Sequence, residues 1–192
     1  MKKALLILLL AACLSGCSAP PAADAEGTPW REEWVSVGNV MGVDTPDGLT
    51  PRENNDTLAA RGMYYAAWSI GEGESYVNAD GEDAEIYDAQ IYLLLAGFSE
   101  AEKAEESATA WKSMAGERYL VEQELDEHRG GVDFDVLTYE FISETNPYAR
   151  GASAFGVYRN YAVSVELSCR ESFAGDPLEV LTRFLESCHY AA

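Results

Sequence analysis

Apolar residues in the first half of the chain fall into runs that predict strands. Three short runs predict strands at residues 34–40, 41–45 and 63–70. The first two runs form either one strand or two. The turn Pro46-Asp47-Gly48 ends the first segment, and the polar stretches 51–57 and 71–83 predict loops. The longer, mostly apolar run 86–96 fits a strand by its isoleucines and tyrosines and a helix by its leucine triplet, so both assignments stay open.

Two segments in the second half of the chain predict helices. Residues 99–114 carry a stripe of alanines at helical spacing, and Ser99 and Glu102 form the pattern of a capping box at its start. Residues 177–190 carry an amphipathic pattern that begins with a proline, for which Asp176 is the predicted N-cap.

Alternating residues between these helices predict two hairpins, with strands at residues 119–128, 132–142, 152–158 and 161–169. Gly130-Gly131 supplies the first turn, and Arg159-Asn160 the second, in which asparagine tolerates a positive φ. The last strand alternates clearly. Its predicted inward positions are Val163, Val165, Leu167 and Cys169, and its predicted outward positions are Ser164, Glu166 and Ser168.

The order of strands, helix, antiparallel meander and helix predicts an α+β domain, because two helices must cover apolar sheet faces. Three segments resemble the Mog1/PsbP-like family: Val43-Asp44-Thr45-Pro46-Asp47-Gly48, Tyr158-Arg159-Asn160-Tyr161-Ala162-Val163 and the closing helix around Phe184-Leu185. The resemblance implies a curved antiparallel β-sheet covered by helices on both faces, an αβα sandwich. Because that family has no shared catalytic residues, the resemblance also implies a binding or assembly scaffold.

The first residues resemble a lipoprotein signal peptide, with two lysines before an apolar run that is too short to span a bilayer. Leu14-Ser15-Gly16-Cys17 resembles the lipobox of bacterial lipoprotein precursors. We therefore expect residues 1–16 to be removed and Cys17 to carry fatty acyl chains such as palmitate. Residues 17–29 are expected to form a flexible tether, and residues 30–192 one extracytoplasmic domain on a bacterial membrane.

Net charge limits the partners of this domain. The chain has 33 acidic and 13 basic residues, a net charge of −20, and loss of the two lysines in residues 1–16 would leave −22. Such a charge repels nucleic acid and anionic lipid headgroups. We therefore expect the domain to be held at the membrane by its lipid anchor alone. It keeps the domain soluble, and it leaves open that some carboxylates bind cations or a basic envelope protein.

Candidate catalytic residues are few. The two histidines, His128 and His189, are not placed beside a nucleophile as Ser-His-Asp or Cys-His catalysis requires. The sequence contains no G-x-S-x-G, H-E-x-x-H or phosphate-binding glycine motif. Abundant acidic and aromatic residues leave a carboxylate-pair hydrolase as the alternative to a binding module, without indicating which carboxylates pair.

The first hairpin predicts a weak cation site. With Gly130-Gly131 as a two-residue turn, residue i faces residue 261 − i, so Asp126 faces Asp135. Glu124 and Asp133 lie on the same side of this pair. Directly opposed like charges destabilise a sheet unless solvent or a cation separates them. The hypothesis is weak binding of a divalent cation by the four carboxylates, and no other cofactor is expected.

Two cysteines, Cys169 and Cys188, remain in the expected domain. Both are predicted to point into one core, in a compartment that permits a disulfide. A helix that returns antiparallel to the last strand would nevertheless hold Cys188 nearer Val163 than Cys169. Because a disulfide needs Cα atoms within about 7 Å of each other, the pattern favours free, buried thiols.

These patterns predict a cell-envelope lipoprotein whose domain is a binding or assembly module without catalytic activity. The alternative is an envelope hydrolase that uses paired carboxylates.

Overall fold

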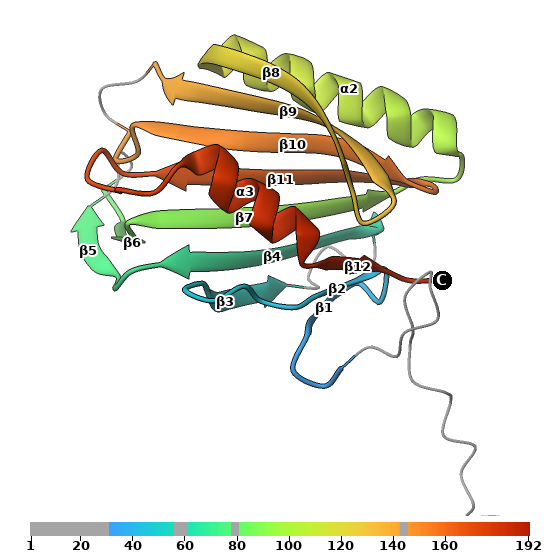
Figure 1. The fold of residues 1–192 in the computed structure, drawn as a ribbon, viewed down its shortest axis with the longest axis horizontal. Helices are drawn as coiled ribbons and strands as arrows, with labels where there is room; N and C mark the ends of the chain where they lie inside the picture. The colour runs from blue at the N-terminus through green and yellow to red at the C-terminus, as the bar shows by residue number, and fades with distance from the viewer. Residues whose placement is uncertain (1–30, 56–60, 78–80, 143–145) are drawn as a thin grey trace, which may run out of the picture.

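The structure is a computed structural model, and it describes residues 31–55, 61–77, 81–142 and 146–192. Seven strands form one antiparallel sheet in the order β3-β4-β7-β11-β10-β9-β8 (Figure 1). Along the chain they are β3 (Thr50–Asn55), β4 (Met63–Ile70), β7 (Ala89–Gly97), β8 (Tyr119–Arg129), β9 (Val132–Phe141), β10 (Arg150–Tyr158) and β11 (Tyr161–Cys169). The expected signal peptide, Cys17 and the tether lie outside the described residues.

In the part of the chain that the structure describes, two small sheets and two helices accompany the large sheet. The other elements are β1 (Val35–Val37), β2 (Met41–Val43), β5 (Glu74–Val77), β6 (Asp83–Ile86), α2 (Ala101–Arg118), α3 (Pro177–Glu186) and β12 (Cys188–Tyr190). β2 pairs with both β1 and β12, so the two ends of the described domain meet in one sheet. Within the described residues, no helix has the length and apolar character needed to cross a membrane.

α3 packs against one face of the large sheet and forms the main core there. Leu181 and Phe184 of this helix are fully buried in a cluster that includes Val163 and Val165 of β11. Trp68 of β4 meets Phe184 edge to face, with ring centroids 4.8 Å apart. Burial of these large side chains is the main contribution of this face to stability.

α2 packs against residues of the opposite face. Ala104 and Ala108 contact Ala162, which alternates along β11 with the valines that face α3. Farther along the helix, Ala115 packs with Tyr139 and with neighbouring aromatic rings. The small alanine side chains let α2 lie close to β8, β10 and β11. The domain is therefore a β-rich α+β structure in which each helix packs against only some of the strands.

The register of both predicted hairpins is confirmed. β8 and β9 pair so that Asp126 faces Asp135, and β10 pairs with β11 along its whole length. In the second turn the positive φ, 55°, belongs to Arg159 rather than to Asn160, which corrects the prediction. The side-chain amide of Asn160 instead donates a hydrogen bond to the carbonyl of Phe98.

Two stretches predicted as loops contain strands. Most of residues 51–57 lies in β3, an edge strand that pairs with β4, and residues 71–83 contain β5. Polar residues form strands here because an edge strand or a two-stranded ribbon makes backbone hydrogen bonds without burying both side-chain faces. The ambiguous run 86–96 resolves as the end of β6 and the central strand β7, where Ile91 and Leu93 are buried.

The start of α2 differs from its prediction. The helix begins at Ala101, and its N-cap Glu100 makes no side-chain capping hydrogen bond. The predicted capping box of Ser99 and Glu102 is therefore wrong. The helix also continues past Met114, since one interior glycine costs only about 1 kcal/mol, which packing against the sheet can offset.

The last helix begins as predicted and ends early. The side chain of Asp176 accepts a hydrogen bond from the backbone N–H of Leu178 at 2.9 Å. The helix ends at Glu186 instead of continuing to residue 190. Residues 188–190 leave the helix because they pair with β2, for example Cys188 with Val43.

Candidate functional site

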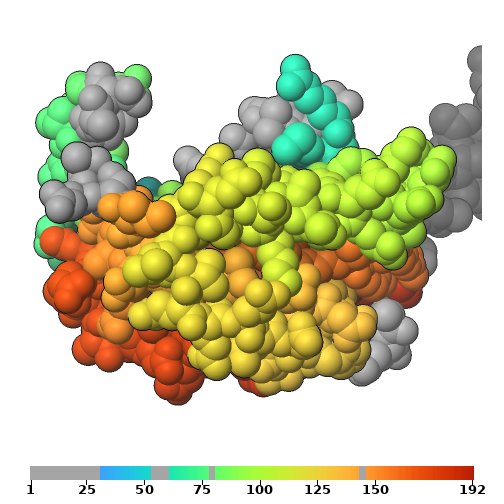
Figure 2. Space-filling view, turned by 90° about the horizontal axis from the view of Figure 1, so that it is seen from above, coloured from blue at the N-terminus to red at the C-terminus, as the bar shows by residue number. Residues whose placement is uncertain are grey.

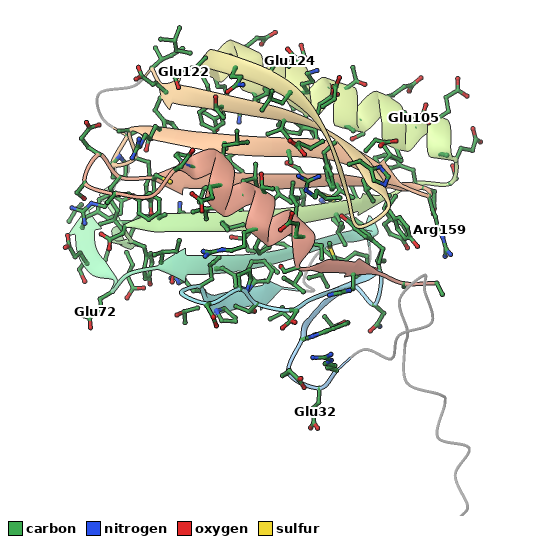
Figure 3. All side chains as sticks on the ribbon, in the orientation of Figure 1. Glu32, Glu72, Glu105, Glu122, Glu124 and Arg159 are labelled. Atoms are coloured by element: carbon green, nitrogen blue, oxygen red, sulfur yellow. The ribbon has the colours of Figure 1, made fainter. Side chains whose placement is uncertain are left out.

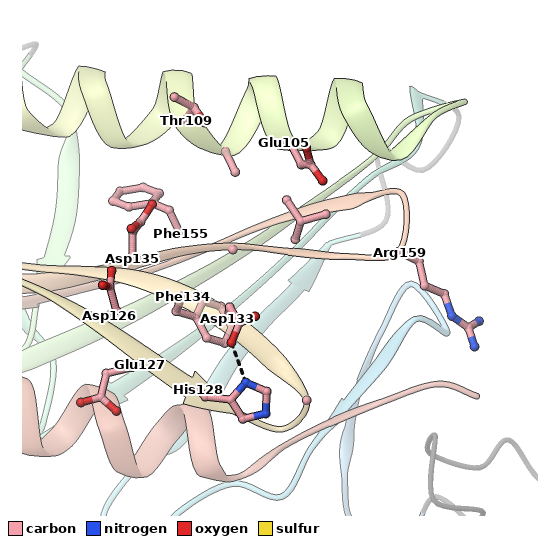
Figure 4. A pocket seen from close by; sticks show the side chains of 14 residues that line it. Glu105, Thr109, Asp126, Glu127, His128, Asp133, Phe134, Asp135, Phe155 and Arg159 are labelled. Atoms are coloured by element: carbon pink, nitrogen blue, oxygen red, sulfur yellow. Dashed lines mark hydrogen bonds and ion pairs between the residues drawn. The ribbon is translucent and has the colours of Figure 1, made fainter.

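A cleft of about 780 Å³ opens between α2 and the β8–β9 hairpin (Figure 4). Figure 2 shows α2 lying beside the hairpin across the face seen from above. Four of the carboxylates that line the cleft lie on its α2 side. One is Glu105 of α2, and the others are Asp126, Asp133 and Asp135 on the face of the hairpin that is turned toward α2. The cleft is therefore strongly acidic.

The hairpin forms the first wall through its register. Asp126 and Asp135 are opposed across the ladder, as are His128 and Asp133. Nδ1 of His128 lies 2.6 Å from Oδ1 of Asp133, whose side chain is 93% exposed. Because opposed residues project to the same side of a sheet, all four groups stand on the α2 face.

α2 forms the second wall. Glu105, Thr109 and Lys112 follow the spacing i, i+4 and i+7, which places them in one stripe along the helix. This stripe begins one residue after the buried Ala104, so it lies at the border of the packed face. The rim of the cleft is therefore polar where α2 leaves the sheet.

The floor of the cleft is apolar. Phe155 of β10 is buried beneath α2, and Val157 of the same strand is partly buried. Arg159 also lines the cleft, but its Nη1 donates to the backbone oxygen of Ala192 at 2.9 Å, and Figure 4 shows its side chain pointing away. An occupant would thus meet carboxylates on the walls and an aromatic ring below.

The predicted cation position has a protein cation beside it. Nζ of Lys112 forms an ion pair with Asp135 at 3.2 Å and contacts Glu124 as well. These contacts raise the pKa of Lys112, with the hydrogen bond to Glu124 as the largest cause. Among the described residues, no group of three or more histidine, cysteine, aspartate or glutamate side chains is placed to hold a metal ion. The divalent-cation hypothesis stays a prediction.

His189 lies in a strand and not in the last helix, where it was predicted. It belongs to β12, and its ring stacks on Trp34 with centroids 4.1 Å apart and planes 8° apart. This stacking gives His189 a packing role between the first and last described segments.

A half-buried carboxyl group lies outside the cleft lining. Glu166 of β11, predicted to point outward, is half-buried on the α2 face and accepts a hydrogen bond from the Tyr119 hydroxyl at 3.2 Å. Burial raises the pKa of Glu166, and it raises the pKa of Tyr119 to about 12. Tyr139, stacked on Tyr119 at 4.0 Å, receives a hydrogen bond from Ser153 at 3.1 Å. This network fixes the packing below the end of α2.

Both domain cysteines are free and buried in the structure. Burial raises the pKa of Cys169 to about 12 and raises the pKa of Cys188 further. The Cys188 thiol donates to the backbone carbonyl of Phe184 in α3 at 3.4 Å. Neither thiol has the solvent exposure of a reactive cysteine.

Sequence reasoning found the hairpin side of this cleft and missed the α2 side. Glu105, Thr109 and Lys112 were not singled out, because the alanine stripe identifies only the buried face of the helix. The sequence signal that could have identified these three residues was their position next to the alanine stripe. The fit of the helix onto the hairpin depends on tertiary packing, which local periodicity does not encode.

No protein-family model matches the chain, and no curated protein sequence does. Among solved structures, cyanobacterial PsbP from Synechocystis sp. PCC 6803 is similar with a TM-score of 0.47 and 9% identity, over 93% of this chain and 99% of that one. A Bacteroides thetaiotaomicron protein is similar with a TM-score of 0.47 and 10% identity, over 81% of this chain and 47% of that one. A Pseudomonas aeruginosa protein of unknown function has a TM-score of 0.38 and 13% identity, over 61% of this chain and 96% of that one.

Proposed function

We propose that this protein is a cell-envelope binding or assembly module, and that its acidic cleft docks a positively charged group of a partner protein. The observation that carries the proposal is the cleft itself, with Glu105, Asp126, Asp133 and Asp135 around an aromatic floor. Complementary charge steers partners together and fixes their register. The element order and the three family-like segments further support a Mog1/PsbP-like αβα sandwich. The resemblance to that family implies a binding or assembly scaffold.

The lipid anchor is the second part of the proposal. The lipobox-like Leu14-Ser15-Gly16-Cys17 supports acylation of Cys17, and two or three acyl chains hold a protein stably on a bilayer. A Cys17→Ser variant should no longer incorporate labelled palmitate and should leave the membrane fraction. Continued labelling, or a mature chain that starts at another residue, would contradict the anchor.

Charge-neutralising variants test the cleft. Glu105→Gln/Asp126→Asn should lose the partners that the wild-type protein retains when it is cross-linked in intact cells and purified. The matched control is Glu32→Gln/Glu72→Gln, which removes the same charge from exposed positions away from the cleft (Figure 3). Equal loss in both variants would show that net charge, not the cleft, determines binding.

The alternative function, a hydrolase with paired carboxylates, is supported by one observation. Asp126 and Asp135 are directly opposed in the cleft, above an aromatic floor. Such an enzyme also needs a carboxyl group that its surroundings keep protonated. Burial raises the pKa of Glu166, which lies outside the cleft lining, whereas Asp135 is ion-paired with Lys112. The cleft therefore supports binding better than acid–base catalysis.

A further inference from the structure

The β8 strand forms one edge of the large sheet beside the acidic cleft. It has 11 residues, and among the described residues its only hydrogen-bonded neighbour strand is β9. In Figure 1 its first part lies at the margin of the sheet next to α2, and the strand then curves across the front of the sheet toward the end of α3, where Arg129 forms an ion pair with Glu186. The backbone N–H and C=O groups on the outer side of such a strand can pair with another extended chain.

Protection of this edge is concentrated at the two ends of β8. The ladder between β8 and β9 is irregular between Val121 and Gln123, and such a bulge hinders further pairing. From Gln123 to Arg129 the register with β9 is regular. The guanidinium of Arg129 donates a hydrogen bond to the backbone carbonyl of His128 at 2.8 Å, so the part from Gln123 to Glu127 has the geometry to accept a partner.

Charge identifies the occupant. Glu122, Glu124 and Asp126 are exposed along β8, and Figure 3 shows the first two at the margin of the sheet. A second copy of β8 would bring acidic side chains against acidic side chains, which destabilises strand pairing. A segment with basic side chains would meet opposite charge at Glu122 and Asp126, whereas Glu124 already contacts Lys112.

Strand alternation sets the pattern of that segment. Glu124 and Asp126 project to the α2 face beside the cleft, whereas Leu125 projects to the α3 face and packs on the main core. Successive residues of a chain paired with β8 would project alternately to the α2 face and to the α3 face. Basic residues would therefore alternate with apolar ones, basic next to the cleft and apolar next to Leu125.

We propose that the β8 edge accepts an extended segment of a partner protein with alternating basic and apolar residues. The segment adds an eighth strand to the large sheet, and its basic side chains reach the acidic cleft. This inference rests on the proposed function, since it names the chemistry and conformation of the partner that the cleft binds. Backbone hydrogen bonds supply part of the affinity and side-chain charge supplies the specificity.

A synthetic peptide tests the proposal. The probe is an eight-residue, end-capped, fluorescent peptide of alternating lysine and valine, titrated into the full protein in a non-ionic detergent. Its control has the same side chains with alternate backbone amides N-methylated, which removes ladder hydrogen bonds and keeps the charge. The unmodified peptide should bind at least about tenfold more tightly, because the methylated peptide cannot form several of the ladder hydrogen bonds to β8. It should also slow hydrogen exchange of β8 amides.

Four outcomes would overturn the edge proposal. Equal binding of both peptides would show charge attraction alone, and would leave the acidic cleft as a binding site. Unchanged affinity of the Glu124→Gln/Asp126→Asn variant for the unmodified peptide would show that the peptide binds elsewhere. A concentration-dependent dimer with protected β8 amides would identify a second copy as the occupant. Binding of neither peptide would count against both the edge and the cleft.

Discussion

The ammonium nitrogen of Lys112 lies 3.2 Å from Oδ1 of Asp135 and also contacts Glu124, so one lysine of α2 joins both strands of the acidic hairpin. The helix thereby supplies the positive charge that the opposed carboxylates of β8 and β9 require. It also forms a link between the two walls of the cleft.

Loss of this link should lower stability modestly. Lys112→Met should reduce the free energy of unfolding by about 0.5–1 kcal/mol, the range expected for a partly exposed ion pair. Urea unfolding measures the change, and added salt should shrink it because salt screens charge. Lys103→Met, at an exposed position of the same helix, is the control. An equal loss in the control would show that the bridge adds nothing specific.

The same variant tests the divalent-cation hypothesis. An ion held by Glu124, Asp126, Asp133 and Asp135 would compete with the Lys112 ammonium for two of these carboxylates. Millimolar calcium should therefore raise the melting temperature more in Lys112→Met than in the wild type. Adding Asp126→Asn should remove the extra shift. The hypothesis fails if calcium leaves both proteins unchanged.

Glu166 should make stability depend on pH. Burial raises its pKa above the ordinary 4.5, so the folded protein retains this proton to a higher pH than the unfolded chain does. The ionised form is then unfavourable in the fold, and stability falls as pH rises above about 4.5. Glu166→Gln keeps an acceptor for Tyr119 and removes this charge.

The stability gained by Glu166→Gln should therefore grow between pH 4 and pH 7, measured by urea unfolding at each pH. Glu140→Gln, at an exposed position of β9, should show little such trend. A gain for Glu166→Gln that does not change with pH would mean that burial of the charge is not the cause.

Helix capping differs between the two helices and gives a paired test. Asp176→Ala removes the acceptor for the Leu178 N–H and should cost about 1 kcal/mol of stability. Glu100→Ala should cost less, because Glu100 makes no side-chain capping hydrogen bond at the start of α2. Thermal or urea unfolding ranks the two variants, and the reverse order would contradict the cap assignment.

Cys169 and Cys188 should both alkylate when the protein is denatured without reductant, because the structure holds them as free thiols. Alkylation of the native protein should be slow, since burial raises the pKa of Cys169 to about 12 and so keeps it protonated. Intact mass after iodoacetamide treatment counts the modified thiols. A denatured, unreduced protein that takes up no label at these two positions would indicate a disulfide.

The local parts of the fold were readable from the sequence alone. The glycine pair at 130–131 and strand alternation were sufficient to place Asp126 opposite Asp135, because a register slip would exchange the two faces of the strand. Asp176 before a proline likewise indicated where α3 begins. Turns and helix caps are formed by residues that are close together in the sequence, so the local residue pattern is sufficient to predict them.

Tertiary structure decided the features that join distant segments. Cys188 lies in β12 rather than in a helix because residues 188–190 pair with β2, near the other end of the described chain. The cleft exists because packing of alanines on the sheet brings the Lys112 stripe of α2 beside the hairpin. Backbone hydrogen bonds between remote strands can form with almost any side chains, so they leave little trace in the residue pattern. Which segments meet is therefore settled by burial of the whole core.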